Sequence, residues 1–77
     1  MSISIKQDDI KIGDNIRRIR KKCKVGQTEL VRKLQLEGIN ITRESLVKIE
    51  RGIQHVKAEQ LRGMRDVLKT TYDELLK

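Results

Sequence analysis

The side chains best suited to chemistry repeat at helical spacing on one predicted helix. One face of the segment 43–51 carries Glu44, Val47, Lys48 and Arg51, with Arg43 at its edge. An α-helix fits the major groove of DNA, where Arg and Lys donate to guanine and Glu accepts from the cytosine amino group. The same charges also suit an ordinary solvated helix face, so the pattern by itself is compatible with DNA binding and leaves both interpretations open.

The composition indicates a small, basic, helical domain. The 77 residues include 18 Lys and Arg against 11 Asp and Glu, which gives a formal net charge of +7. Such a charge attracts polyanions, whether nucleic acid, an acidic protein or an anionic membrane surface. Phe, Trp and Pro are absent, and the single aromatic residue is Tyr72. This mixture favours an all-α fold over a β-sandwich.

Enzymatic and metal-binding functions find little support. A single cysteine, Cys23, and a single histidine, His55, provide neither a zinc ligand set nor a paired nucleophile and base. We therefore expect no enzyme, no metal and no cofactor, with Cys23 in the core and His55 on the surface. No apolar run reaches membrane-spanning length and no signal-peptide hydrophobic stretch is present, so we expect a cytoplasmic, nucleoid-associated protein without membrane contact.

Apolar periodicity and capping signals predict five helices and no strands. Residues 1–11 are expected to form a flexible N-terminal arm, and residues 12–77 one domain. Gly38 and Gly52 suit helix ends, and Thr42 suits a helix start. Gly63 falls inside a predicted helix, where it costs about 1 kcal/mol relative to Ala. The expected helices are 13–23, 27 to 36 or 37, 43–51, 57–69 and a short one after Thr71.

Three segments resemble the lambda-repressor-like helix-turn-helix family of phage repressors, Cro proteins and their bacterial relatives. They are IGDNIRRIRKKCKVGQTELVRKL, ITRESLVKIERG and TTYDELL, in that order. The resemblance covers about 65 of the 77 residues. It implies a compact five-helix domain in which the second and third helices form a helix-turn-helix, and the third enters the major groove.

The resemblance also implies roles for individual residues. Arg43, Glu44 and Lys48 match positions that contact base edges in relatives. Arg20 and Glu50 match a partly buried salt bridge that joins the first helix to the third. Gln27, Ser45 and Arg51 match positions that contact the DNA backbone in relatives. We expect Arg17 and Thr42 to contact the DNA backbone as well.

Three features differ from the family pattern. Seven residues separate Leu34 from Thr42, where relatives have two, so the second helix is longer or the connection bulges. Val31 stands where a small alanine commonly packs the two helices together, and Lys57 replaces the usual capping residue of the fourth helix. We expect a changed spacing between the second and third helices.

The sequence therefore predicts a sequence-specific regulator of transcription that binds double-stranded DNA, most simply a repressor acting as a homodimer. Tyr72, Leu75 and Leu76 are expected either to form the dimer contact or to cover the core. The alternative is an antitoxin-like or other protein-interaction module that uses the same fold to bind a protein such as a toxin.

Overall fold

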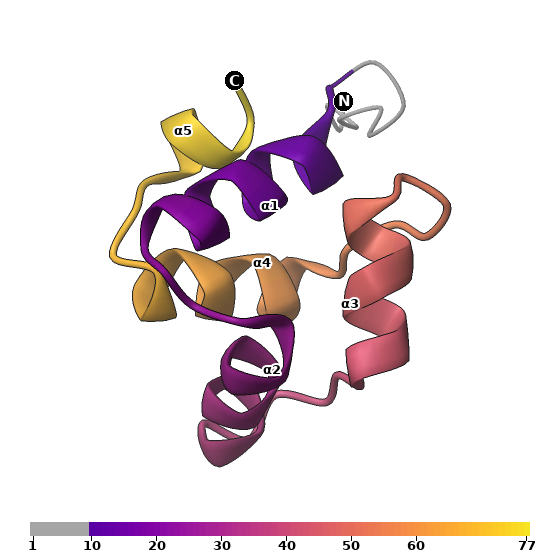
Figure 1. The fold of residues 1–77 in the computed structure, drawn as a ribbon, viewed down its shortest axis with the longest axis vertical. Coiled ribbons are helices and arrows are strands. Elements are labelled where there is room, and N and C mark those ends of the chain that lie inside the picture. The colour runs from indigo at the N-terminus through magenta and orange to yellow at the C-terminus, as the bar shows by residue number, and fades with distance from the viewer. Residues whose placement is uncertain (1–9) are drawn as a thin grey trace, which may run out of the picture.

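The computed structural model describes residues 10–77, and these residues form five α-helices and no strand (Figure 1). The all-α, five-helix prediction is confirmed. Residues 1–9, most of the predicted arm, lie outside the described part, whereas Ile10 packs against the core. Within the described residues no helix is long and apolar enough to cross a membrane. The helices are α1 (Ile12–Lys22), α2 (Gln27–Leu36), α3 (Arg43–Glu50), α4 (Ala58–Val67) and α5 (Tyr72–Leu75).

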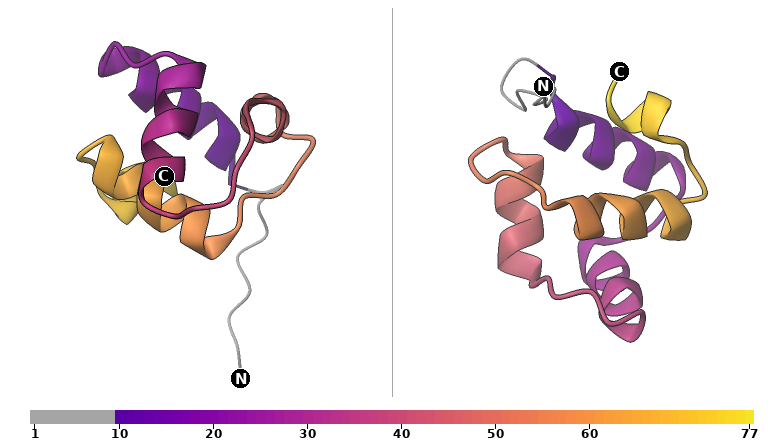
Figure 2. Two further views of the ribbon diagram at one scale, coloured as in Figure 1. Left: turned by 90° about the horizontal axis from the view of Figure 1, so that it is seen from below. Right: turned by 180° about the vertical axis from the view of Figure 1, so that it is seen from behind.

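The helices pack around one centre, with α3 and α5 on opposite sides. Helix α1 contacts α3 and α5, and α2 contacts α3 and α4. Figure 2 shows α3 at one side of the molecule and α5 at the other in both views. Consecutive helices α2 and α3 therefore pack against each other, an arrangement compatible with a helix-turn-helix.

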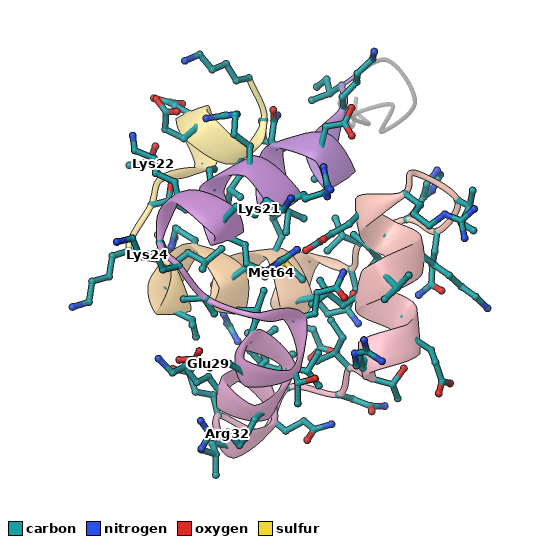
Figure 3. All side chains as sticks on the ribbon, in the orientation of Figure 1. Lys21, Lys22, Lys24, Glu29, Arg32 and Met64 are labelled. Carbon is teal, nitrogen blue, oxygen red and sulfur yellow. The ribbon has the colours of Figure 1, made fainter. Side chains whose placement is uncertain are left out.

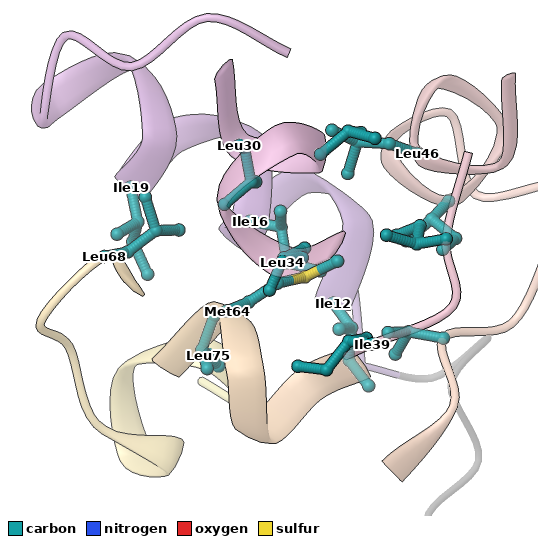
Figure 4. Close-up of a cluster of buried hydrophobic side chains, with 14 residues drawn as sticks. Ile12, Ile16, Ile19, Leu30, Leu34, Ile39, Leu46, Met64, Leu68 and Leu75 are labelled. Carbon is teal, nitrogen blue, oxygen red and sulfur yellow. The ribbon is translucent and has the colours of Figure 1, made fainter. Parts of the chain in front are cut away.

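The core is aliphatic and receives side chains from all five helices (Figure 4). Each fully buried side chain of this size contributes about 1.5–3 kcal/mol relative to an exposed one. Leu75 of α5 belongs to this set, so it covers the core. The largest fully buried side chains are Ile16, Leu30, Leu34, Leu46, Ile49, Met64 and Leu75.

Helix α5 packs against α1, and Tyr72 at its start also contacts Arg65 of α4. The guanidinium of Arg65 lies 4.6 Å from the centre of the Tyr72 ring. Its Nε also donates to a carboxylate oxygen of Asp66 at 3.0 Å, and this hydrogen bond raises the pKa of Arg65 above its ordinary value. Of the two residues expected with Leu75 to form a dimer contact, Tyr72 is exposed, and Leu76, the C-cap of α5, is half-buried.

The prediction that Cys23 lies in the core is wrong, because Cys23 is exposed. The apolar stripe of α1 ends with Ile19, and α1 itself ends at Lys22, which leaves Cys23 at the C-cap. Its thiol donates to the carbonyl oxygen of Leu68 at 3.5 Å. The next apolar residue, Val25, is the one that packs against the core.

Helices α1 to α4 end in the same backbone arrangement, a Schellman motif. After α1, for example, the N–H of Val25 donates to the carbonyl of Arg20 at 3.1 Å. The motif needs a positive φ at the residue after the C-cap, a region that costs a residue with a side chain about 1–2 kcal/mol. Glycine meets this need after α2 and α3, and lysine occupies it after α1 and α4. The residues are Gly38 (φ 80°), Gly52 (φ 79°), Lys24 (φ 59°) and Lys69 (φ 52°).

The long connection between α2 and α3 runs close against the core. Ile39 and Ile41 are both buried. The amide Nε2 of Gln35 donates to the carbonyl of Ile41 at 2.8 Å, and Nε2 of Gln60 donates to the carbonyl of Asn40 at 3.1 Å. The connection therefore buries two apolar side chains in the core, and hydrogen bonds from two amide side chains hold its backbone in place.

Two helical glycines allow close approach between elements. A Cβ added at Gly13 would clash with the backbone carbonyl oxygen of Ile49, so α1 and α3 can cross only at a glycine. A Cβ added at Gly63 would meet the side chains of Ile39 and Leu34. The helix-propensity cost of Gly63 is therefore offset by closer packing of α4 against α2 and the connection.

We predict that Gly13→Ala lowers the free energy of unfolding by about 1–3 kcal/mol, even though alanine is the better helix former. The added methyl meets rigid backbone, which cannot rotate away. Thermal unfolding followed by circular dichroism measures the loss. Gly26→Ala is the matched control, because a Cβ there meets nothing within 4 Å, and it should cost less than about 1 kcal/mol. Equal losses in the two variants would contradict the close crossing.

We also predict that Lys24→Gly raises the free energy of unfolding by about 0.5–1 kcal/mol, because glycine adopts positive φ without a Cβ penalty. Lys21→Gly removes the same side chain from the last turn of α1, where φ is helical, and should cost about 1 kcal/mol. Urea titrations of both variants test the difference. Destabilisation by both would show that the backbone at Lys24 carries no penalty.

Candidate nucleic-acid interface

The start of α3 is fixed by its own cap. Thr42 Oγ1 accepts from the backbone N–H of Ser45 at 3.0 Å, and the Thr42 hydroxyl donates to Ser45 Oγ at 3.0 Å. Leu46 and Ile49 are fully buried and anchor the inward face. Cap and anchors together determine which side chains of α3 face solvent.

The outward face of α3 is charged and lacks internal pairing. Arg43, Glu44 and Lys48, the residues expected to contact bases, are all exposed on it, and so is Arg51. Val47 is half-exposed between them. Within residues 10–77, none of these four charged side chains forms an ion pair with another described residue. Their charges are thus available to an external partner.

A hollow of about 290 Å³ lies beside this face, where α1, α2 and α3 meet. It brings together Arg17, Gln27 and Arg51, three of the residues expected to contact a DNA backbone. Asp14 also lines the hollow and is not among the residues predicted to form the site. Its position three residues before Arg17 on α1 is the signal that could have found it. The lining residues are Asp14, Arg17, Gln27, Val47, Glu50 and Arg51.

A buried ion pair joins α1 to α3 beside the hollow, which one of its two residues, Glu50, lines. Arg20 Nε and Nη2 donate to the two oxygens of Glu50 at 2.7 and 2.9 Å. Only 9% of the Arg20 side chain and 2% of the Glu50 side chain are exposed. Arg20 Nη1 also donates to the carbonyl of Val25 at 2.9 Å. The structure therefore brings together the two residues expected to pair, in bidentate geometry.

Gln27 connects α2 to this pair. Its Nε2 donates to Glu50 Oε1 at 3.1 Å, which uses one of the two amide hydrogens and leaves the other for a ligand. Gly26 provides no side-chain cap at the start of α2. The N–H groups of the first turn of α2 therefore stay open to solvent or to an anion.

Two other basic side chains of α1 lie on a different surface. Arg18 and Lys22 line a second hollow, of about 360 Å³, together with Lys69 after α4. Figure 3 shows Lys22 and Lys24 on the side of the molecule away from α3. Basic side chains of α1 thus lie on two surfaces: Arg17 lines the hollow beside α3, and Arg18 and Lys22 line the second hollow.

No family model matches this sequence, and neither a curated protein nor a solved structure matches it. Among residues 10–77, no three His, Cys, Asp or Glu side chains come together in a way that could hold a metal ion.

We predict that Arg20→Met lowers the free energy of unfolding by about 3–5 kcal/mol, because it leaves Glu50 buried without its partner. Adding Glu50→Leu should recover part of the loss, since the double variant buries no unpaired charge. Circular dichroism during urea unfolding measures both. Lys33→Met, which breaks the exposed pair with Glu29, should cost less than about 1 kcal/mol. Glu50→Leu is also measured alone. If the double variant loses as much free energy of unfolding as the two single variants together, the coupling between Arg20 and Glu50 is contradicted.

Proposed function

We propose that this chain is a sequence-specific regulator of transcription that binds double-stranded DNA, with α2 and α3 acting as a helix-turn-helix and α3 lying in the major groove. The observation that supports this proposal best is the outward face of α3. Its charged side chains are exposed and unpaired, while its inward face is fixed by the core and by the Arg20–Glu50 pair. The sequence resemblance to lambda-repressor-like proteins points the same way.

The proposed base contacts follow from side-chain chemistry. Arg43 and Lys48 donate to the O6 and N7 atoms of guanine, and Glu44 accepts from the cytosine amino group. A carboxylate near DNA is repelled by phosphates, so Glu44 would disfavour sites that offer no amino group at its position. Glu44 thus contributes to selectivity by rejection as well as by contact.

The proposed backbone contacts surround these base contacts. Arg17 and Arg51 donate to phosphate oxygens from the hollow, and Gln27 does so with its remaining amide hydrogen and the α2 N-terminus. Thr42 and Ser45 lie at the start of α3, where the Ser45 hydroxyl keeps its own proton for a phosphate. Each phosphate neutralised releases counterions, so the logarithm of the binding constant should fall with the logarithm of salt concentration by about 0.9 per phosphate.

We also propose that the protein acts as a repressor and as a homodimer on a two-fold-related site. Half-sites would lie about 34 Å apart, one turn of DNA. The longest dimension of the described domain, 35 Å, is similar to this spacing. A contact through α5 would rest on Tyr72 and Leu76, because Leu75 is buried in the core.

A second candidate function is protein interaction, either neutralising a partner as an antitoxin-like module does or binding an acidic protein. The observation that favours it is the second hollow, where Arg18, Lys22 and Lys69 lie away from α3. These cations would suit an acidic partner surface. Because the two surfaces are separate, a protein partner and DNA could be bound by the same chain.

Selection from random double-stranded DNA tests the proposed function. We predict that the wild-type chain enriches a two-fold-related motif and that the Arg43→Ala/Lys48→Ala double variant does not, because these residues supply the base contacts. Arg32→Ala/Lys33→Ala removes the same charge from exposed positions on α2, and should still enrich the wild-type motif. Salt-sensitive binding without enrichment in all three proteins would contradict sequence-specific readout by α3.

A further inference from the structure

Val47 is the apolar exception on a charged surface. It is half-exposed, on the helix face that carries Arg43, Glu44, Lys48 and Arg51. The half-buried apolar side chains that pack against the core do not include it; they are Ile10, Val25, Leu61, Val67 and Leu76. Val47 instead lines the hollow between α1, α2 and α3. Its methyl groups are therefore not used to stabilise the core.

If α3 lies in the major groove, DNA offers Val47 one apolar group to contact. In the major groove, base edges present hydrogen-bond donors and acceptors, and the single apolar group among them is the C5-methyl of thymine. Valine in a helix has one strongly preferred rotamer, so its two methyl groups are already held in place before binding. Contact between the two apolar groups would remove both from water.

We infer that Val47 is a specificity-determining residue that selects a thymine by packing against its methyl group. The inference rests on the proposed function and adds a contact class that the charged residues cannot supply. Val47 lies one turn after Arg43 and directly before Lys48, so the thymine belongs to the same half-site as their guanines. Three large hydrophobic side chains of the described residues are more exposed, Leu36 at 79%, Ile53 at 63% and Tyr72 at 37%, but they lie outside α3.

Replacing thymine with deoxyuridine removes only the methyl group and tests the inference. With the motif enriched by the wild-type chain, each thymine is replaced in turn and affinity is measured by fluorescence anisotropy. We predict one position per half-site where the wild-type chain loses affinity about fourfold, the factor that corresponds to burial of about one methyl group. Val47→Ala should bind the unmodified motif more weakly by a similar factor and be insensitive to deoxyuridine at that position.

Leu36→Ala is the matched control, since it shortens an exposed apolar side chain away from α3, and it should keep the full deoxyuridine effect. If deoxyuridine weakens binding equally in the wild-type chain and Val47→Ala at every position, the inference about Val47 is overturned while the proposed function stands. If no motif is enriched at all, both fail. The two failures are therefore distinguishable by the first step of the experiment.

Discussion

The arrangement of the first three helices depends on one buried ion pair. Arg20 of α1 holds both oxygens of Glu50 in α3, and Gln27 of α2 donates to the same carboxylate. Arg20 also holds the carbonyl of Val25 in the α1–α2 connection. A buried charge is tolerated only when it is paired and its remaining hydrogen-bonding groups are satisfied. Any change in the angle between these helices would break bonds that water cannot replace, so the network restricts them to one arrangement.

The aliphatic core could not impose that restriction alone. Contacts among Ile, Leu and Met side chains are non-directional, and such cores accept several packings of similar free energy. Gly13 adds a second directional constraint, since α1 passes against the backbone of α3 at Ile49, directly before Glu50. The close crossing brings the Arg20 side chain within reach of the carboxylate. Hydrogen bonds and steric fit thus select one orientation of α3 from those that the core would allow.

Much of this structure follows from local signals in the sequence. Helix ranges could be predicted because Thr42, Gly38 and Gly52 act on their own neighbouring residues, whatever the rest of the chain does. Cys23 was assigned wrongly because periodicity does not report where a helix ends, and α1 stops just before it. The close crossing at Gly13 was not foreseen, because distance between helices is a property of two segments.

In the candidate site, too, local spacing predicts some features, whereas others depend on how the helices pack. Spacing alone placed Arg43, Glu44 and Lys48 on one face of α3, since that grouping needs only helical geometry. Predicting the hollow requires the angles among three helices. The sequence pattern does not contain these angles, so it could not show that Asp14 and Val47 line the hollow. The burial of the α2–α3 connection could not be predicted either, because it depends on amide hydrogen bonds between residues of different elements.

The two faces of α3 therefore have separate physical roles. Inward residues such as Leu46, Ile49 and Glu50 hold the helix in place, whereas the outward charged residues form no ion pair within the described chain. Outward side chains can then change with little cost to folding, since surface substitutions away from such contacts usually shift stability by less than about 0.5 kcal/mol. The inward contacts keep α3 in one orientation. Changes of the outward side chains would therefore alter the chemistry of the exposed face without moving the helix.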